Sequence, residues 1–172
     1  MIMLTPAMAE DLRIRSFVAT RVAYMRFVGR YGSPTIPEMW RRFDDWCTAR
    51  GLKLPGRRMF GVAQDNPNIT RPDQTRYDVC IEVDMAFEPV ADVGVQTIPG
   101  GRFACVPFRG RIADIGPAWV TLLGKILPDA GYEPDLAPAI ELYESHAVVD
   151  RHTEVFDCTL CMPVRGEPAG NL

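Results

Sequence analysis

The sequence predicts an α+β fold built from a duplicated β-α-β-β unit, and three observations indicate it. The same order of signals occurs twice: a strand, a turn with glycine, a helix with tryptophan, a short strand and a long strand. Equivalent positions keep a nearly constant spacing, because Gly110 follows Gly29 by 81 residues (110 − 29) and Gly131 follows Gly51 by 80 (131 − 51). The clearest strand segment alternates apolar and polar residues, which is typical of antiparallel sheets.

Each unit supplies one helix to cover one sheet face, so neither unit is expected to bury its apolar surface alone. We therefore expect the units, at residues 12–86 and 93–164, to pair about a pseudo-twofold axis in a single domain that spans 12–164. A loose leader (1–11) and a polar tail (165–172) flank this domain. The groove between two such units is the natural place for a ligand.

In the first unit, strands are expected within 12–29, at 58–63 and at 77–85, with an exposed loop at 64–73. A helix should begin near Thr35 and end at Gly51. Its apolar stripe comprises Met39, Trp40, Phe43, Trp46 and Cys47. The 77–85 strand is predicted to point Tyr77, Val79, Ile81, Val83 and Met85 inward, and Asp78, Glu82 and Asp84 outward.

The second unit begins with strands at 95–98 and 102–109, joined by a tight turn that contains Gly100 and Gly101. A helix follows, with Asp114 as its cap and Pro117 in its first turn. Its buried stripe is predicted to be Trp119, Leu122, Leu123 and Ile126. Strands at 138–143 and 155–163 complete the unit.

The 138–143 strand carries one carboxylate, Glu141, between apolar neighbours. Side chains alternate along a strand, so Glu141 and Tyr143 share one face, while Ile140 and Leu142 share the other and are expected to pack on helices. Gly61 occupies the equivalent position of the first unit and leaves room there. A carboxylate beside aromatic rings in a cleft would bind a cation, whereas in an ordinary half-exposed sheet Glu141 would lie in solvent.

Composition limits the class of protein. The 172 residues are 47% hydrophobic and 24% charged, typical of a globular domain, and the net charge of −3 argues against nucleic-acid binding. Without a membrane-length apolar run or a signal-peptide pattern, a cytoplasmic protein with no membrane role is expected. The five cysteines are expected to be reduced and buried. Cys158 and Cys161 lie three apart on a strand and should point to opposite faces, so no metal or other cofactor is predicted.

Four short segments in order resemble the gyrase-inhibitor-like (GyrI-like) small-molecule-binding domain, which is also the effector-binding part of some AraC-type and MerR-type regulators. The resemblance covers roughly residues 12–164. It rests on Asp65-Asn66-Pro67 through Arg76-Tyr77-Asp78-Val79-Cys80, then Ile98-Pro99-Gly100-Gly101-Arg102-Phe103-Ala104, then Trp119-x-x-Leu122, and Pro138-x-x-Glu141-x-Tyr143.

The resemblance implies a duplicated β-α-β-β fold with a hydrophobic, often cationic compound in a central groove. It implies that Glu141 provides the counter-charge and that Tyr143 lies on the same face. It further implies that Phe156 comes from the last strand with Glu154 just before it, and that Trp119 and Phe60 are walls.

The function that these features predict is non-enzymatic binding of a lipophilic cationic small molecule. One alternative is a modulator that binds gyrase or another protein partner. Another is a hydrolase of electrophilic natural products in which Glu141 acts as a general base. The sequence contains no recognisable nucleophile elbow, and His146 and His152 share one loop that is expected to be solvated, so no catalytic residue is predicted.

Overall fold

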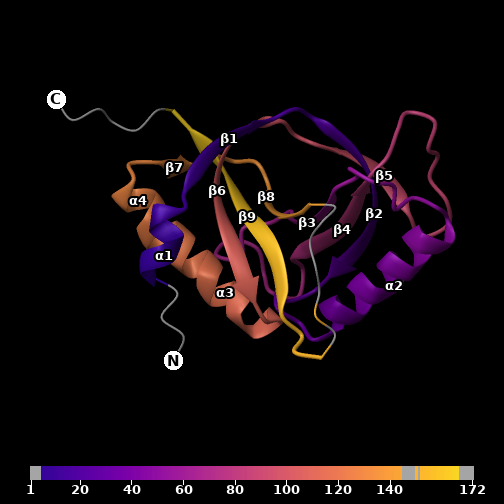
Figure 1. Ribbon diagram of the computed structural model, residues 1–172, viewed down its shortest axis with the longest axis horizontal. Helices are drawn as coiled ribbons and strands as arrows, with labels where there is room; N and C mark the ends of the chain where they lie inside the picture. The colour runs from indigo at the N-terminus through magenta and orange to yellow at the C-terminus, as the bar shows by residue number, and fades with distance from the viewer. Residues whose placement is uncertain (1–4, 145–149, 151, 167–172) are drawn as a thin grey trace.

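The computed structural model describes residues 5–144, 150 and 152–166. It confirms an α+β fold: one curled antiparallel sheet with helices beside each half (Figure 1). Helix α2 lies next to the half that contains β2 and β4, and helices α1, α3 and α4 lie next to the half that contains β6 and β9. The elements of the first unit, with the helix that precedes it, are α1 (Thr5–Glu10), β1 (Arg13–Phe17), β2 (Thr20–Val28), α2 (Thr35–Ala49), β3 (Met59–Ala63) and β4 (Arg76–Glu82).

The second unit repeats this order, but its helix is divided into three segments and one strand is added. Its elements are β5 (Gly94–Ile98), β6 (Gly101–Gly110), α3 (Ile112–Thr121), η1 (Leu122–Ile126), α4 (Leu127–Asp129), β7 (Glu133–Pro134), β8 (Ala139–Tyr143) and β9 (Phe156–Arg165). The added strand β7 pairs with β9 at the edge of the fold.

The order of the strands shows the predicted duplication directly. The sheet runs β1-β6-β9-β8-β3-β4-β2-β5. Counted outward from the central β3–β8 pair, the first unit contributes β3, β4 and β2, and the second contributes the equivalent strands β8, β9 and β6 in the same order. At the middle of that pair, Gly61 lies opposite Glu141. The pseudo-twofold axis therefore passes between Gly61 and Glu141, the two positions that the repeat makes equivalent.

The two units also exchange their first strands. β1 pairs with β6 of the second unit, and β5 pairs with β2 of the first. In Figure 1 the β1–β2 segment forms an arc over the sheet from one half to the other. Where the two bent segments cross, a Cβ at Gly100 would lie 2.7 Å from the Phe17 carbonyl oxygen, so glycine permits this close contact.

The curl of the sheet creates an interior on both of its faces. Two apolar clusters lie under the helices, one around Phe43 and one around Leu122. A third cluster lies inside the curl and contains Phe60, Val62, Ile140, Leu142 and residues of β2, β4, β5, β6 and β9. The expectation that Ile140 and Leu142 pack on helices is wrong, because these side chains face the strands that arch over them.

The same geometry corrects the prediction for the 77–85 strand. Tyr77, Val79 and Ile81 are buried as predicted, but Asp78 is fully buried instead of facing water. Its face of β4 points into the curl, where an arginine and two glutamines surround it. Met85 is 81% exposed because β4 ends at Glu82, so the alternation no longer applies to it.

Two helical segments also differ from expectation. The leader is not loose over residues 5–10, which form α1, with Met8 buried against the second unit. The predicted stripe of the second helix is interrupted because residues 122–126 form a π-helix, whose wider turn leaves Leu123 exposed while Leu122, Ile126 and Leu127 are buried. Asp114 is the third helical residue rather than the cap, and its carboxylate accepts the Arg111 backbone N–H at 2.9 Å.

Within the residues that the structure describes, no helix has the length and apolar character needed to cross a bilayer. The five cysteines are free and buried. Cys158 lies in the cluster under α3 and Cys161 lies inside the curl, so they occupy opposite faces, as their spacing predicts.

Candidate functional site

The candidate site is built around Glu141, which lies at the centre of β8 on the face that the helices border. Its flanking residues Ile140 and Leu142 are buried on the other face, which fixes the direction of the carboxylate. Glu141 Oε2 accepts two phenolic hydrogen bonds, from Tyr77 Oη at 2.9 Å and from Tyr143 Oη at 3.0 Å. The first donor comes from the other unit, so the site joins the two halves of the protein.

Trp40 of α2 closes the site from the side of the first helix. Its indole N–H donates to Tyr77 Oη at 3.0 Å, and its ring lies 4.8 Å from the ring of Tyr143, centroid to centroid. A chain of hydrogen bonds therefore runs from Trp40 through Tyr77 to Glu141. The indole that starts this chain also covers Tyr143, the second donor to the carboxylate.

Gly61 makes this arrangement sterically feasible. A Cβ at this position would overlap the Tyr77 hydroxyl oxygen and would lie 2.8 Å from Glu141 Oε2. A carbon atom this close to two oxygen atoms is strongly repelled by both. Any side chain at this position would therefore push the Tyr77 hydroxyl away from the Glu141 carboxylate. The missing side chain in the first unit thus creates the space in which the carboxylate of the second unit is bound.

Burial controls the ionisation of the site. It raises the pKa of Glu141, and the hydrogen bonds from Tyr77 and Tyr143, with a smaller interaction from Trp119, oppose that rise. Burial, with the nearby Glu141 carboxylate, also raises the pKa of both tyrosines well above 10.0. The phenols therefore remain protonated donors, and no arginine or lysine of the described chain forms an ion pair with Glu141 or contributes to its pKa shift.

Of the residues that the sequence predicted for the site, four lie together. Glu141 and Tyr143 form its centre, and Trp119 of α3 packs against the same apolar cluster as Tyr143. Phe156, the first residue of β9, is partly buried with its ring 6.3 Å from that of Tyr143.

The two others lie elsewhere. Phe60 belongs to the cluster inside the curl, because it precedes Gly61 on β3 and therefore points to the opposite face. Glu154 is an exposed turn residue with φ of 57°, and its backbone N–H donates to the Asp150 carbonyl. Of the two histidines, His152 is exposed and His146 lies outside the described residues.

Sequence reasoning missed Tyr77 and Trp40 as site residues and assigned both to the core. Both are indeed packed against the apolar cluster under α2. Their polar atoms gave the available signal, because a buried tyrosine hydroxyl or indole N–H requires a hydrogen-bond partner. Only the pairing of β3 with both β4 and β8 shows that this partner is Glu141.

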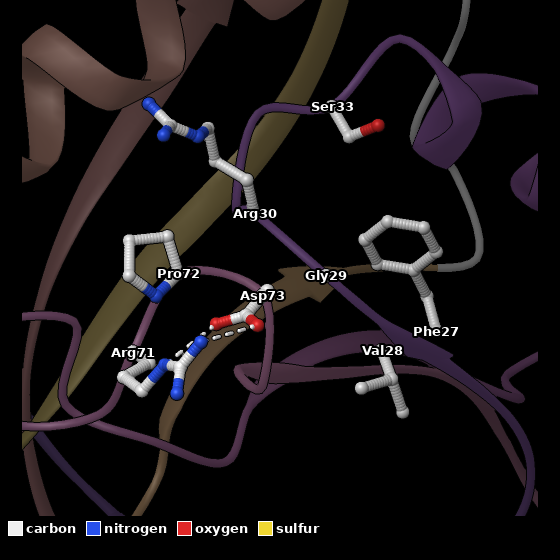
Figure 2. Close-up of a pocket in the computed structure, with 8 residues that line it drawn as sticks. All are labelled: Phe27, Val28, Gly29, Arg30, Ser33, Arg71, Pro72 and Asp73. Carbon is white, nitrogen blue, oxygen red and sulfur yellow. Dashed lines mark hydrogen bonds and ion pairs between the residues drawn. The ribbon is translucent and has the colours of Figure 1, made fainter.

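Open hollows of the surface lie away from this site. One, of about 650 Å³, is formed by the end of β2, the loop between β2 and α2, and the loop that precedes β4. Figure 2 shows Arg71 and Asp73 paired at its rim, with Phe27, Val28 and Arg30 around it. A smaller hollow of about 230 Å³ separates α1 from α4. Neither of these two hollows is lined by Glu141 or its aromatic neighbours.

Sequence comparison gives this geometry its family context. The profile of the GyrI-like small molecule binding domain matches residues 10–165. The chain belongs to the GyrI-like family. A relative from Edwardsiella piscicida named DNA gyrase inhibitor is 29% identical over 139 residues, which cover 78% of this chain and 87% of that protein.

Solved structures with the same fold include two proteins of low sequence identity to this chain. The C-terminal domain of EcmrR has a TM-score of 0.68 at 15% identity, covering 90% of this chain and 96% of that domain. SAV2435 bound to tetraphenylphosphonium has a TM-score of 0.62 at 16% identity, covering 91% of this chain and 94% of that one. The GyrI-like fold that the resemblance implied is thereby confirmed.

Proposed function

We propose that this GyrI-like domain binds a hydrophobic, cationic small molecule at Glu141. The observation that carries the proposal is a partly buried carboxylate that two phenols hold, with no cationic side chain of the described residues to neutralise it. A buried charge without a counter-ion is costly, so the site favours either a proton or a cation from solution.

Binding would follow from the chemistry of these groups. A cation placed near Oε2 stabilises the ionised carboxylate and lowers the pKa of Glu141 from its raised value in the free protein. The faces of Trp40, Trp119 and Tyr143 add cation–π attraction and apolar contact area. The apolar surface supplies affinity, while the carboxylate selects for positive charge.

Binding of a ligand beside Glu141 requires a movement of the aromatic side chains that pack there. Trp40 covers Tyr143 and bonds to Tyr77, so it occupies the space beside the carboxylate in this structure. A ligand would displace its indole and break one hydrogen bond, at a cost of about 1 kcal/mol. This exchange of an internal aromatic ring for a ligand ring would change the fluorescence of Trp40.

A structural relative supports the class of ligand. SAV2435 has the same fold and was solved with tetraphenylphosphonium, a cation that carries four phenyl groups. The relatives named DNA gyrase inhibitor give the second proposal, a protein partner such as gyrase. A hydrolase that uses Glu141 as a general base is the third.

The test is a tryptophan-fluorescence titration with lipophilic dyes of matched size that are cationic, neutral or anionic. We expect micromolar binding of the cations, weakened at least tenfold, or about 1.4 kcal/mol, in Glu141→Gln. The matched control is Glu144→Gln, which removes one charge from the same chain segment at a partly exposed position outside the site, where Glu144 pairs with Arg15. The affinity of Glu144→Gln for the cationic dyes should equal that of the wild type.

Other outcomes distinguish the alternatives. Equal binding of all three dye classes, or equal loss in both variants, would contradict a charge-selective pocket at Glu141. If no dye binds and gyrase is captured from solution, the protein-partner proposal is favoured. Consumption of an electrophilic ester that stops in Glu141→Gln would favour the hydrolase.

A further inference from the structure

Two of the five cysteines lie directly opposite each other inside the curl of the sheet. Cys105 of β6 and Cys161 of β9 are paired residues in an antiparallel ladder, and their Sγ atoms are 3.1 Å apart. Both thiols are free, with residue exposures of 3% and 0%. This contact is unrelated to the Glu141 site, which lies on the other face of the sheet.

The backbone already has the geometry that a disulfide needs. Directly paired residues in antiparallel strands have Cα atoms about 4.5–5.5 Å apart, within the range of about 4.4–6.8 Å found across disulfides. The two sulfur atoms must approach by roughly 1 Å to reach the bonded distance of about 2.05 Å. A rotation of the two side chains is the movement that would bring the sulfur atoms together.

The surroundings also make one of the two thiols the better nucleophile. The hydrogen bond with Cys161, helped by the positive charge of Arg15 on β1, lowers the pKa of Cys105 against the opposing effect of burial. The other cysteines lack this help, since burial raises the pKa of Cys47 to about 12 and raises those of Cys80 and Cys158 as well. A thiolate, rather than a thiol, is the reactive species.

We propose that Cys105 and Cys161 are a redox-active pair that forms a reversible intramolecular disulfide with hydrogen peroxide. The Cys105 thiolate attacks one peroxide oxygen, the O–O bond breaks, and Cys105 sulfenic acid and hydroxide result. The Cys161 thiol then attacks this sulfur, the S–O bond breaks, and water leaves as the S–S bond forms. In sum, two thiols and one peroxide give one disulfide and two waters.

The burial of the pair determines which oxidant it would accept. A small neutral peroxide can reach a thiol that a bulky disulfide reagent cannot approach in line. Arg15, whose side chain is 40% exposed, places its positive charge close enough to lower the pKa of Cys105. Cys158, only three residues from Cys161, cannot compete because it points to the other face of β9.

The experiment uses the folded, fully reduced protein with its five thiols. It is treated with a graded excess of hydrogen peroxide, unfolded, alkylated and weighed by intact mass spectrometry. We expect the number of alkylated thiols to fall from five to three, with a non-reduced peptide map that joins Cys105 to Cys161 and a return to five after dithiothreitol. Cys47→Ser should form the same link, with alkylated thiols falling from four to two.

Cys161→Ser provides the complementary variant. It should form no internal disulfide and should instead accumulate sulfenic or sulfinic acid at Cys105. The proposal is overturned if the wild type joins other cysteines or oxidises only after unfolding in urea. It is also overturned if Cys105 in the wild type ends as sulfinic acid without a crosslink. Peptide mapping of the wild type alone decides these outcomes, whether or not the variant folds.

Discussion

The substitution Gly61→Ala tests the central claim about the site, that a missing side chain makes room for the tyrosine–carboxylate contact. The added Cβ would overlap Tyr77 Oη and lie 2.8 Å from Glu141 Oε2. Both neighbours are held on rigid central strands, β4 and β8, so neither can retreat easily. The methyl group should therefore break the Tyr77–Glu141 hydrogen bond.

The magnitude follows from three contributions. Loss of a hydrogen bond to a carboxylate costs about 1.5–3 kcal/mol. Overpacking of a well-packed site adds about 1–3 kcal/mol. The lower backbone entropy of alanine in the unfolded chain offsets about 0.5–1 kcal/mol of this loss of stability. We expect the free energy of unfolding to fall by about 2–5 kcal/mol.

The assay is urea unfolding followed by far-ultraviolet circular dichroism, which does not depend on Trp40. The matched control is Gly116→Ala in α3, where a Cβ would meet no atom within 4 Å. There the higher helix propensity of alanine should raise stability by about 0.5–1 kcal/mol. If Gly61→Ala is as stable as the wild type, the space at Gly61 is not what maintains the Tyr77–Glu141 contact, and the reasoning is refuted.

Two further predictions concern the partly buried carboxylate of Glu141 and the fully buried carboxylate of Asp78. Because burial raises the folded-state pKa of Glu141 above its usual 4.5, its protonated form stabilises the fold below that pH, and this contribution is lost as pH rises through the folded-state pKa. The stability of the wild type relative to Glu141→Gln should therefore decrease from pH 4 upward in urea melts, and a constant difference would contradict the burial. Asp78 is fully buried and forms a bidentate pair with Arg26 at 2.8 and 2.9 Å, so Asp78→Ala should cost about 3–5 kcal/mol by the same assay. In contrast, Asp73→Ala, which breaks an exposed pair with Arg71, should change stability by less than about 1 kcal/mol.

The Asp78 site illustrates why sequence alternation alone was not sufficient. Its carboxylate also accepts the side-chain amides of Gln64 and Gln96, at 2.9 and 2.8 Å, which come from β3's end and from β5. In a flat sheet with one wet face, this side of β4 would meet water. Here β2 and β5 curve over it, and a polar residue that reads as exposed becomes the centre of a buried hydrogen-bond network.

The sequence by itself determined the duplication, the α+β class and the prominence of Glu141. These features are local or periodic: helix stripes, strand alternation and an 80-residue offset are present in the order of the residues, whatever the final packing. The same local rule correctly placed Glu141 and Tyr143 on one face of β8, and Cys158 and Cys161 on opposite faces of β9.

Only the tertiary structure decided which distant residues meet. Tyr77 and Trp40 reach Glu141 because β3 lies between β4 and β8 and because α2 borders that junction, and Phe60 is excluded by one step of alternation. Cys105 meets Cys161 through the register of β6 and β9. Strand pairing joins residues more than fifty positions apart, and its register is set by the closure of the whole curled sheet, so no local pattern could specify these contacts.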